Sequence, residues 1–158
     1  MMVEIPKTVS QSKAELIDLV LPLDTNMYGT IFGGTVMAYA DKIATISAMR
    51  HCRMPVVTAR SDSFEFHAPI KIGEAICIEA MVICAFSTSM EVLVKIHAEH
   101  LLTGKKTPTS QAYLTMVAID ENSRAVKVPP IIPITEEEKE HYRLAMERYQ
   151  IRKSKNTN

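Results

Sequence analysis

The feature that most constrains the fold of this chain is a helix-like stretch, Val36 to Met49, that is almost wholly apolar. A helix without a polar face is unsuited to the surface, so we expect other elements to cover it on most sides. One carboxylate, Asp41, stands within this stretch. A carboxylate on a buried helix must be paired, hydrogen-bonded or functional, which makes Asp41 the first candidate for a catalytic residue. The alternative is a structural acid paired with Arg50, Arg60 or another cation.

Strand-like runs flank this helix, and turns with proline or glycine punctuate them. We predict strands over residues 14–23, 56–67, 74–86, 90–102 and 109–119. One strand, one helix and four longer strands describe an α+β domain in which a mostly antiparallel, five- to six-stranded sheet wraps the long helix.

The 158 residues suit a single domain with a sizeable core. We expect residues 1–12 to be a flexible leader and residues 13–128 to form the domain. Residues 129–158 then supply a proline-rich bridge and a C-terminal helix. Thr135 begins that helix, and Glu138 stands at its capping-box position.

Composition excludes several classes of protein. The 18 basic and 18 acidic residues balance, so no nucleic-acid-binding surface is indicated. Cys52, Cys77 and Cys84 are odd in number and form no CxxC pair, which predicts neither a disulfide framework nor a metal site. The N-terminus lacks a signal-peptide pattern, and no apolar run is long enough for a bilayer. We therefore expect a cytoplasmic protein with no membrane partner.

A second group of candidates precedes Asp41. Gly33 and Gly34 stand where the helix should begin, and the first N–H groups of a helix have no partner within it. Without a Cβ, a glycine lets a ligand oxygen approach these donors, an arrangement that can hold a developing oxyanion. Asn26 adds an amide upstream, or is an ordinary Asx-turn residue. Thr45 lies on the Asp41 face, or bonds back to its own helix.

The helix geometry sets a constraint on these candidates. Gly33 and Asp41 are eight residues apart, about 12 Å of helical rise, so both cannot touch one carbonyl from the same helix. If both act on one substrate, the glycine end of one subunit must face Asp41 of another. We therefore predict a dimer whose site straddles the interface.

The motif Asn-x-x-Gly-x-x-x-Gly-Gly, which runs from Asn26 to Gly34 and precedes the helix with Asp41, resembles that of the hotdog-fold acyl-CoA thioesterases. The nearest branch is that of the short bacterial relatives of the brain acyl-CoA hydrolases, and the resemblance covers about residues 14–121. It implies a hotdog fold, Asn26 and Asp41 as catalytic residues, and a hexamer built as a trimer of dimers. The spacing of Asn26, Gly33, Asp41 and Thr45 is also similar to the Gln, Gly, Glu and Thr of one 4-hydroxybenzoyl-CoA thioesterase class.

Further residues are candidates for binding the substrate. The resemblance places His67 near the acyl-CoA cleft, and Thr88 and Ser89 beside the pantetheine and phosphate path, with Phe86 where many relatives have glycine. Arg60 and Lys71 are candidate partners for CoA phosphates, because arginine and lysine are common anion binders. The alternatives are a structural role for His67, turn hydroxyls at Thr88 and Ser89, and solvated surface charge at Arg60 and Lys71.

The leading hypothesis is hydrolysis of the acyl-CoA thioester without a cofactor, since CoA is part of the substrate. Asp41 would act as a general base on water or attack the carbonyl itself, and the sequence leaves both routes open. One alternative is a hotdog enoyl-thioester hydratase, although the helix offers no histidine near Asp41. The other is a non-catalytic acyl-CoA-binding sensor. Acyl-chain length and the choice between hexamer and tetramer stay open.

Overall fold

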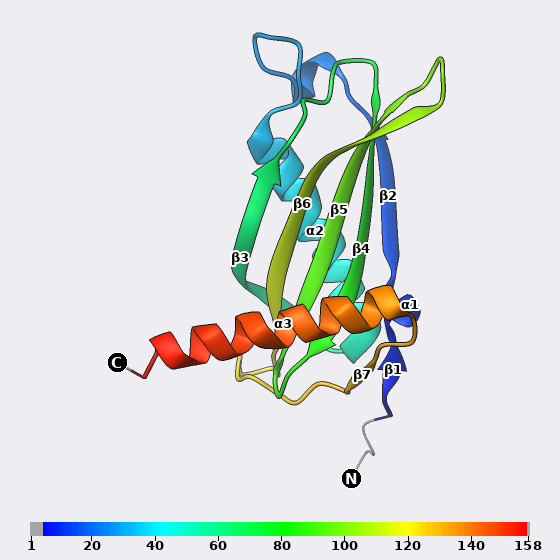
Figure 1. The fold of residues 1–158 in the computed structure, drawn as a ribbon. Helices are drawn as coiled ribbons and strands as arrows, with labels where there is room; N and C mark the ends of the chain where they lie inside the picture. Colours follow the sequence, from blue (N-terminus) through cyan, green and yellow to red (C-terminus); the bar gives the residue numbers. More distant parts are fainter. Residues whose placement is uncertain (1–4, 158) are drawn as a thin grey trace.

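The computed structural model describes residues 5–157 and consists of one layered α+β domain (Figure 1). Its elements, in chain order, are β1 (Lys7–Thr8), α1 (Val9–Ser12), β2 (Ala14–Leu19), the 3₁₀ turn η1 (Pro22–Asp24), α2 (Gly33–Cys52), β3 (Val56–Phe66), β4 (Ala75–Ala85), β5 (Ser89–His100), β6 (Lys105–Ala118), β7 (Ile131–Ile132) and α3 (Glu136–Lys155).

The main sheet has five strands in the order β2-β4-β5-β6-β3, and every neighbouring pair is antiparallel. The predicted fold class and strand set are thereby confirmed. Most strand ends agree with the prediction to within two residues, and two differ from it by four. The first strand stops at Leu19 because Pro22 begins a 3₁₀ turn, and the last strand begins at Lys105 because it pairs with β5 as far as His100.

The two long helices cover opposite faces of this sheet, with α2 behind it and α3 across the front in the view of Figure 1. The inner core lies between α2 and the sheet. Small residues on α2 permit the close approach, among them Ala40, Ala44 and Ala48, all fully buried. A second, smaller cluster lies under α3, where Ile83, Cys84 and Leu93 of the sheet meet Ala145.

The expectation that α2 is covered on most sides is wrong for the single protomer. Only the face toward the sheet is buried, and the opposite face leaves Met37, Ile46 and Met49 between 43% and 45% exposed. Asp41 lies on that open face and is exposed rather than buried. The helix is apolar on both faces, but this sheet covers one face, so an apolar helical surface remains open.

The flexible leader predicted over residues 1–12 needs correction where the structure describes it. Lys7–Thr8 pairs in parallel with β7, and Val9 and Ser12 of the short helix α1 are buried. The Ser12 hydroxyl donates to the Val9 carbonyl (2.7 Å) and accepts from the backbone N–H of Val82 (2.9 Å). The Ser12 side chain thus satisfies a backbone N–H group of β4 at the point where the pairing with β2 has not yet begun, just before Ala14. Residues 1–4 of the leader lie outside the described residues.

The C-terminal helix begins as predicted. The Thr135 side chain accepts from the backbone N–H of Glu138, and Glu138 accepts from that of Thr135, which completes the capping box. Farther along α3, Tyr149 stacks on Phe86 with ring centroids 4.1 Å apart. The aromatic residue at the turn before β5 therefore helps to hold α3 on the sheet.

Candidate active site

The amino end of α2 opens onto a cavity of about 350 Å³. Phe32, the N-cap residue, has a side chain that caps no N–H group of the helix, so the first amides of the Gly33–Gly34 turn are not satisfied in this way. A Cβ on Gly33 would lie 3.4 Å from the ring of Phe66, whereas one on Gly34 would meet nothing within 4 Å. The cavity is lined by Ile31, Gly33, Val36, Phe66, His67, Ala68, Pro69, Ile70 and Ser110. A mostly apolar wall and helix N–H donors suit an acyl group with a polar carbonyl.

Asn26 shapes the loop that precedes this helix. Its Oδ1 accepts from the backbone N–H groups of Tyr28 (2.9 Å) and Thr30 (3.3 Å), and its Nδ2 donates to the Thr30 hydroxyl (3.0 Å). The structure therefore has the Asx-type turn that was the alternative for this residue. The Asn26 amide nitrogen has two hydrogens, and the turn uses one of them, so the second can donate to a substrate.

Asp41 has a partner that the sequence did not reveal. The hydroxyl of Thr58, on β3, donates to Asp41 Oδ1 at 2.5 Å. A hydroxyl has one proton to give, so this bond fixes one carboxylate oxygen and leaves Oδ2 on the open face of α2. This contact is compatible with Asp41 as a general base and with Asp41 as a nucleophile. Among residues 5–157 no arginine or lysine pairs with Asp41, so the structural ion pair that was the alternative is absent there.

Thr45 does not reach the carboxylate. Its hydroxyl donates to the backbone carbonyl of Asp41 at 2.9 Å, which is the back-bonding that threonine often shows inside a helix. A role for Thr45 in the site stays a prediction. Thr58 fills the place that the sequence reasoning gave to Thr45, and strand β3 supplies it 17 residues after Asp41.

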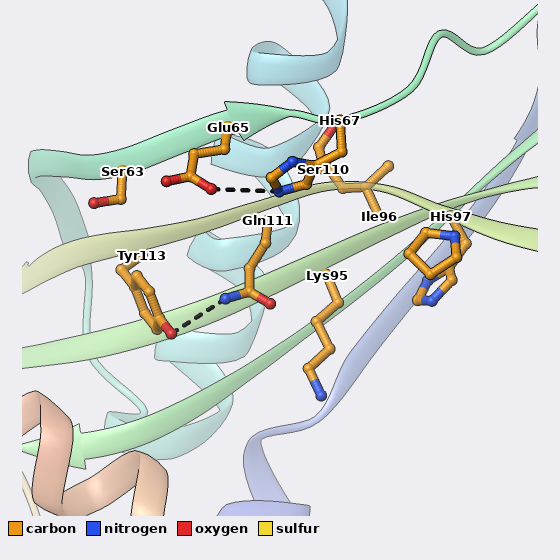
Figure 2. Close-up of a pocket in the computed structure, with 10 residues that line it drawn as sticks. Ser63, Glu65, His67, Lys95, Ile96, His97, Ser110, Gln111 and Tyr113 are labelled. Atoms are coloured by element: carbon orange, nitrogen blue, oxygen red, sulfur yellow. Dashed lines mark hydrogen bonds and ion pairs between the residues drawn. The ribbon is translucent and has the colours of Figure 1, made fainter.

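Two of the predicted substrate-binding residues lie near the amino end of α2. His67 lines the cavity beside Gly33 and also a second cavity on the outer face of the sheet. In that second cavity His67 Nε2 lies 3.3 Å from Glu65 Oε2, as Figure 2 shows. Lys71 lies in the loop beside the Asn26 turn, where Thr30 and Lys71 form an isolated bridge.

The other three predicted substrate-binding residues lie elsewhere in the protomer. Arg60 points to the outer face of β3, where its Nε lies 2.7 Å from Asp62 Oδ1. Thr88 and Ser89 lie at the β4–β5 turn, and the Thr88 carbonyl accepts from the N–H of Ala118. That turn is at the end of the sheet opposite the start of α2 (Figure 1). A single protomer therefore does not bring all candidates together, and their roles stay predictions.

A signal for Thr58 was present in the sequence. A strict two-residue period over the run 56–67 places Thr58 on the same face as Phe64 and Phe66. The structure keeps Thr58 and Phe66 on one face of β3, because two shifts in register lie between them and cancel each other. Neither a metal-binding group of side chains nor a helix able to span a membrane occurs among the described residues.

Known proteins match this chain over almost its whole length. A family model described as Thioesterase superfamily matches residues 28–105. The acyl-CoA thioester hydrolase YkhA of Bacillus subtilis, which is described as uncharacterized, is 44% identical over 154 residues, a stretch that covers 96% of this chain and 90% of that protein. The chain belongs to the acyl-CoA thioester hydrolase family.

Solved structures of this family share the fold. The crystal structure of a hexameric acyl-CoA thioesterase without ligand has a TM-score of 0.91 at 45% identity, over 96% of this chain and 98% of that one. The acyl-CoA hydrolase of Staphylococcus aureus, in complex with butyryl-CoA, CoA and CoA disulfide, has a TM-score of 0.88 at 40% identity, over 96% and 93%. Structures of that enzyme also include variants with alanine in place of an aspartate, an asparagine or a threonine. The hotdog fold predicted from the motif is confirmed.

Proposed function

We propose that this chain hydrolyses acyl-CoA thioesters to a free acid and CoA at a site that two protomers build together. The observation that carries this proposal is the exposed Asp41 carboxylate, oriented by the Thr58 hydroxyl at 2.5 Å. It lies about 12 Å along the same helix from the Gly33 amide, too far for one thioester to touch both. If a second protomer places the Gly33 end of its own α2 beside Asp41, one thioester can contact both groups.

A twofold dimer satisfies the requirement with a simple geometry. If Asp41 of each protomer faces Gly33 of the other, the two α2 helices run antiparallel and cross near Met37, midway between those residues. Met37 is 45% exposed in the protomer, and Phe32 and Phe66 near the amide end are each 51% exposed. Strand β3 is a long edge strand of the sheet, and such edges are normally covered. The open apolar face and the open strand edge thus lie on the same side of the molecule as Asp41.

The relatives support the same residues. In the S. aureus enzyme the asparagine, the aspartate and the threonine replaced by alanine follow one another at intervals of 15 and 17 residues. Asn26, Asp41 and Thr58 have the same intervals. One solved relative is named as hexameric, so a trimer of such dimers is the assembly that we propose for this chain.

The chemistry follows from these positions. The thioester carbonyl accepts from the free N–H groups at Gly33 and Gly34 of one protomer, with the spare Nδ2 hydrogen of Asn26 nearby. These donors stabilise the negative charge that develops on the carbonyl oxygen. Asp41 of the partner subunit uses Oδ2 in one of two ways. As a general base it takes a proton from a water that adds to the carbonyl, and the C–S bond then breaks to give the free acid and the CoA thiolate, which takes up that proton. As a nucleophile it attacks the carbonyl and expels the CoA thiolate to form an anhydride, and water then cleaves the anhydride, which releases the free acid, regenerates the Asp41 carboxylate and supplies the proton that the thiolate takes up.

Neither route needs an organic cofactor, and we propose none. The apolar cavity beside Gly33 would hold the acyl group. His67 lines this cavity and Lys71 lies in the loop that pairs with Thr30, and we place both beside the CoA part of the substrate. We place three further residues, Arg60, Thr88 and Ser89, against the nucleotide part of a CoA molecule whose acyl group is bound by a neighbouring subunit. The free thiols of the three cysteines suit the cytoplasm, where we place the protein.

Subunit complementation tests the shared site directly. Asp41→Asn keeps the shape of the side chain but removes the base or nucleophile, and Asn26→Ala removes the amide of the other half. Each variant alone should lose at least about 100-fold in turnover of butyryl-CoA, measured as released thiol. In a mixed dimer one site receives intact Asn26 from one chain and intact Asp41 from the other.

Mixing the two variants after reversible dissociation should therefore restore about one quarter of the wild-type activity, because half of the dimers are mixed and each has one intact site. If the site lies within one protomer, mixing restores nothing above the two separate variants. If Asp41→Asn retains full turnover, Asp41 has no part in the reaction.

A further inference from the structure

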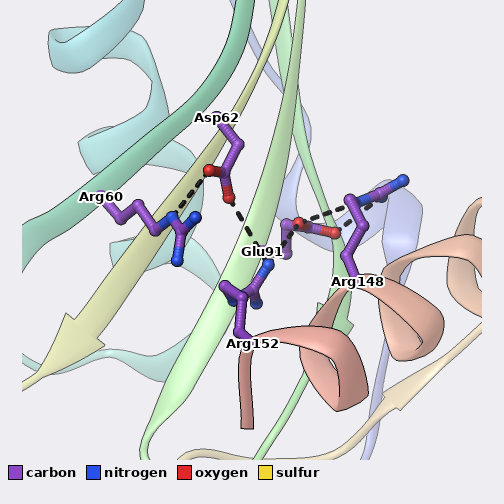
Figure 3. A network of polar contacts seen from close by, with 5 residues as sticks. All are labelled: Arg60, Asp62, Glu91, Arg148 and Arg152. Carbon is purple, nitrogen blue, oxygen red and sulfur yellow. Dashed lines mark hydrogen bonds and ion pairs between the residues drawn. The ribbon is translucent and has the colours of Figure 1, made fainter. Parts of the chain in front are cut away.

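A polar network fastens the C-terminal helix to the outer face of the sheet (Figure 3). At its centre is Glu91, on β5, whose side chain is fully buried. Arg148 of α3 donates to both of its carboxylate oxygens, from Nε to Oε1 at 3.1 Å and from Nη2 to Oε2 at 2.8 Å. The same guanidinium lies over the ring of Tyr113, 4.0 Å from the centroid. This part of the network explains how a carboxylate can be buried there.

The network continues from the helix to the edge strand. Nη1 of Arg152, one turn after Arg148, lies 3.5 Å from Asp62 Oδ2 and 3.8 Å from Glu91 Oε1. Arg60 holds the other oxygen of Asp62, with Nε 2.7 Å from Oδ1. Both Asp62 and Arg152 are largely buried, with 19% and 16% of the side chain exposed. The carboxylate of Asp62 is thus held between its own strand and α3.

Asp62 lies in the irregular part of β3. The register of β3 against β6 shifts between Thr58 and Arg60 and again between Asp62 and Glu65. Ser63 has a φ of 51°, a backbone conformation that residues other than glycine rarely adopt. Each shift interrupts the ladder of backbone hydrogen bonds. The backbone alone therefore sets the position of this segment less firmly than it sets the regular strands.

Thr58 stands directly at the first of these shifts. We propose that Asp62 is a positioning residue: its contacts with Arg152 and Arg60 hold the irregular segment of β3 so that the Thr58 hydroxyl stays on Asp41. The C-terminal helix, on the outer face of the sheet, thereby supports the carboxylate on the inner face. This inference rests on the proposed catalytic role of Asp41 and Thr58.

A double-mutant cycle in the full-length oligomer tests it, with Asp62→Ala, Thr58→Ala and the two combined. Asp62→Ala leaves the buried Glu91–Arg148 pair in place, so the helix stays anchored. We expect Asp62→Ala to lower kcat for butyryl-CoA about tenfold while KM stays within about twofold, because a small displacement of a catalytic group weakens turnover more than binding. In the Thr58→Ala background the same change should cost less than about twofold, because the hydroxyl it positions is already gone.

Arg152 supplies a rescue test. It meets both carboxylates through a single nitrogen, Nη1, so a lysine can replace that contact. Arg152→Met should lower kcat as Asp62→Ala does, and Arg152→Lys should restore at least half of it. Lys95→Ala is the matched control, because it breaks the 3.2 Å pair between Lys95 and Glu137, which ties the same helix to central strand β5. This control should retain full kcat.

The outcomes separate the inference from the proposed function. If Thr58→Ala leaves kcat unchanged, the role of Thr58 in the reaction is wrong and the inference is wrong with it. If Thr58→Ala lowers kcat but Asp62→Ala does not, only the inference is wrong. Equal fold losses from Asp62→Ala in both backgrounds also overturn it, because Asp62 would then act by a route that does not pass through Thr58.

Discussion

The buried carboxylate of Glu91 makes the stability of this protein depend on one arginine. Arg148 donates two hydrogen bonds to Glu91, whose side chain is fully buried. Replacing Arg148 by methionine keeps much of the aliphatic contact but removes both donors. Among the residues that the structure describes, the cation left near Glu91 is then Arg152, whose Nη1 lies 3.8 Å away. A buried charge left with one weak partner destabilises the folded state.

The size of the loss follows from the geometry. Breaking a buried ion pair from one side costs about 3–5 kcal/mol. Because Arg148 is itself 26% exposed and Arg152 remains, we expect the lower end of that range, about 3 kcal/mol per protomer. The lost contact with Tyr113 is included in this figure. With a urea dependence of about 2 kcal/mol per molar, the unfolding midpoint should fall by about 1.5 M.

Urea unfolding followed by circular dichroism, at one fixed protomer concentration, measures this change. Arg143→Met is the matched control, because Arg143 lies on the same helix and pairs with Glu140 and Glu147 at the surface. Its midpoint should not change measurably. The double variant Glu91→Met/Arg148→Met should recover most of the loss, since no charge remains buried. The reasoning is refuted if Arg148→Met shifts the midpoint by less than about 0.5 M, or if the double variant is no more stable than Arg148→Met.

Two further predictions concern a buried histidine, His51, and a buried cysteine, Cys84. Burial lowers the pKa of His51, whose fully buried ring bonds the Pro129 carbonyl through Nε2 at 2.7 Å. The unfolded chain therefore binds a proton first as the pH falls below about 6.5, and stability should be lost in this range by at most about 1.4 kcal/mol per pH unit and protomer. Urea midpoints between pH 7.5 and 5.5 measure this loss, and an equally steep loss in His51→Asn would assign it to other groups. Burial raises the pKa of Cys84 to about 12, with the nearby Glu91 charge adding to the effect, so iodoacetamide at pH 8 should modify the half-buried Cys77 first and Cys84 only after unfolding, as peptide mass spectrometry can show. Early labelling of Cys84 would contradict this order.

Local patterns predicted much of the architecture. The apolar helical stretch, the alternating strands and the capping box at Thr135 each depend on residues close together in the chain, and the structure confirms the helix, the strand set and the cap. The same patterns did not predict that Ser12 is buried, because its hydrogen-bond partner Val82 lies on β4, 70 residues away. The glycine motif with Asn26 and Asp41 carried the family resemblance, which the comparisons confirm.

By itself, the sequence determined the class of fold, the family, and the separation of Gly33 from Asp41, because eight residues of α-helix have a definite length. Only the tertiary structure decided which hydroxyl meets Asp41. Thr45 is one helical turn away, yet its hydroxyl goes to a backbone carbonyl of its own helix. Thr58 reaches the carboxylate because the pairing of β3 with β6 places it opposite Met116, a buried residue of the inner core, on the face toward α2, and that pairing joins strands far apart in the chain. The exposure of Asp41 was decided in the same way, since an apolar helix does not reveal which of its faces the sheet will cover.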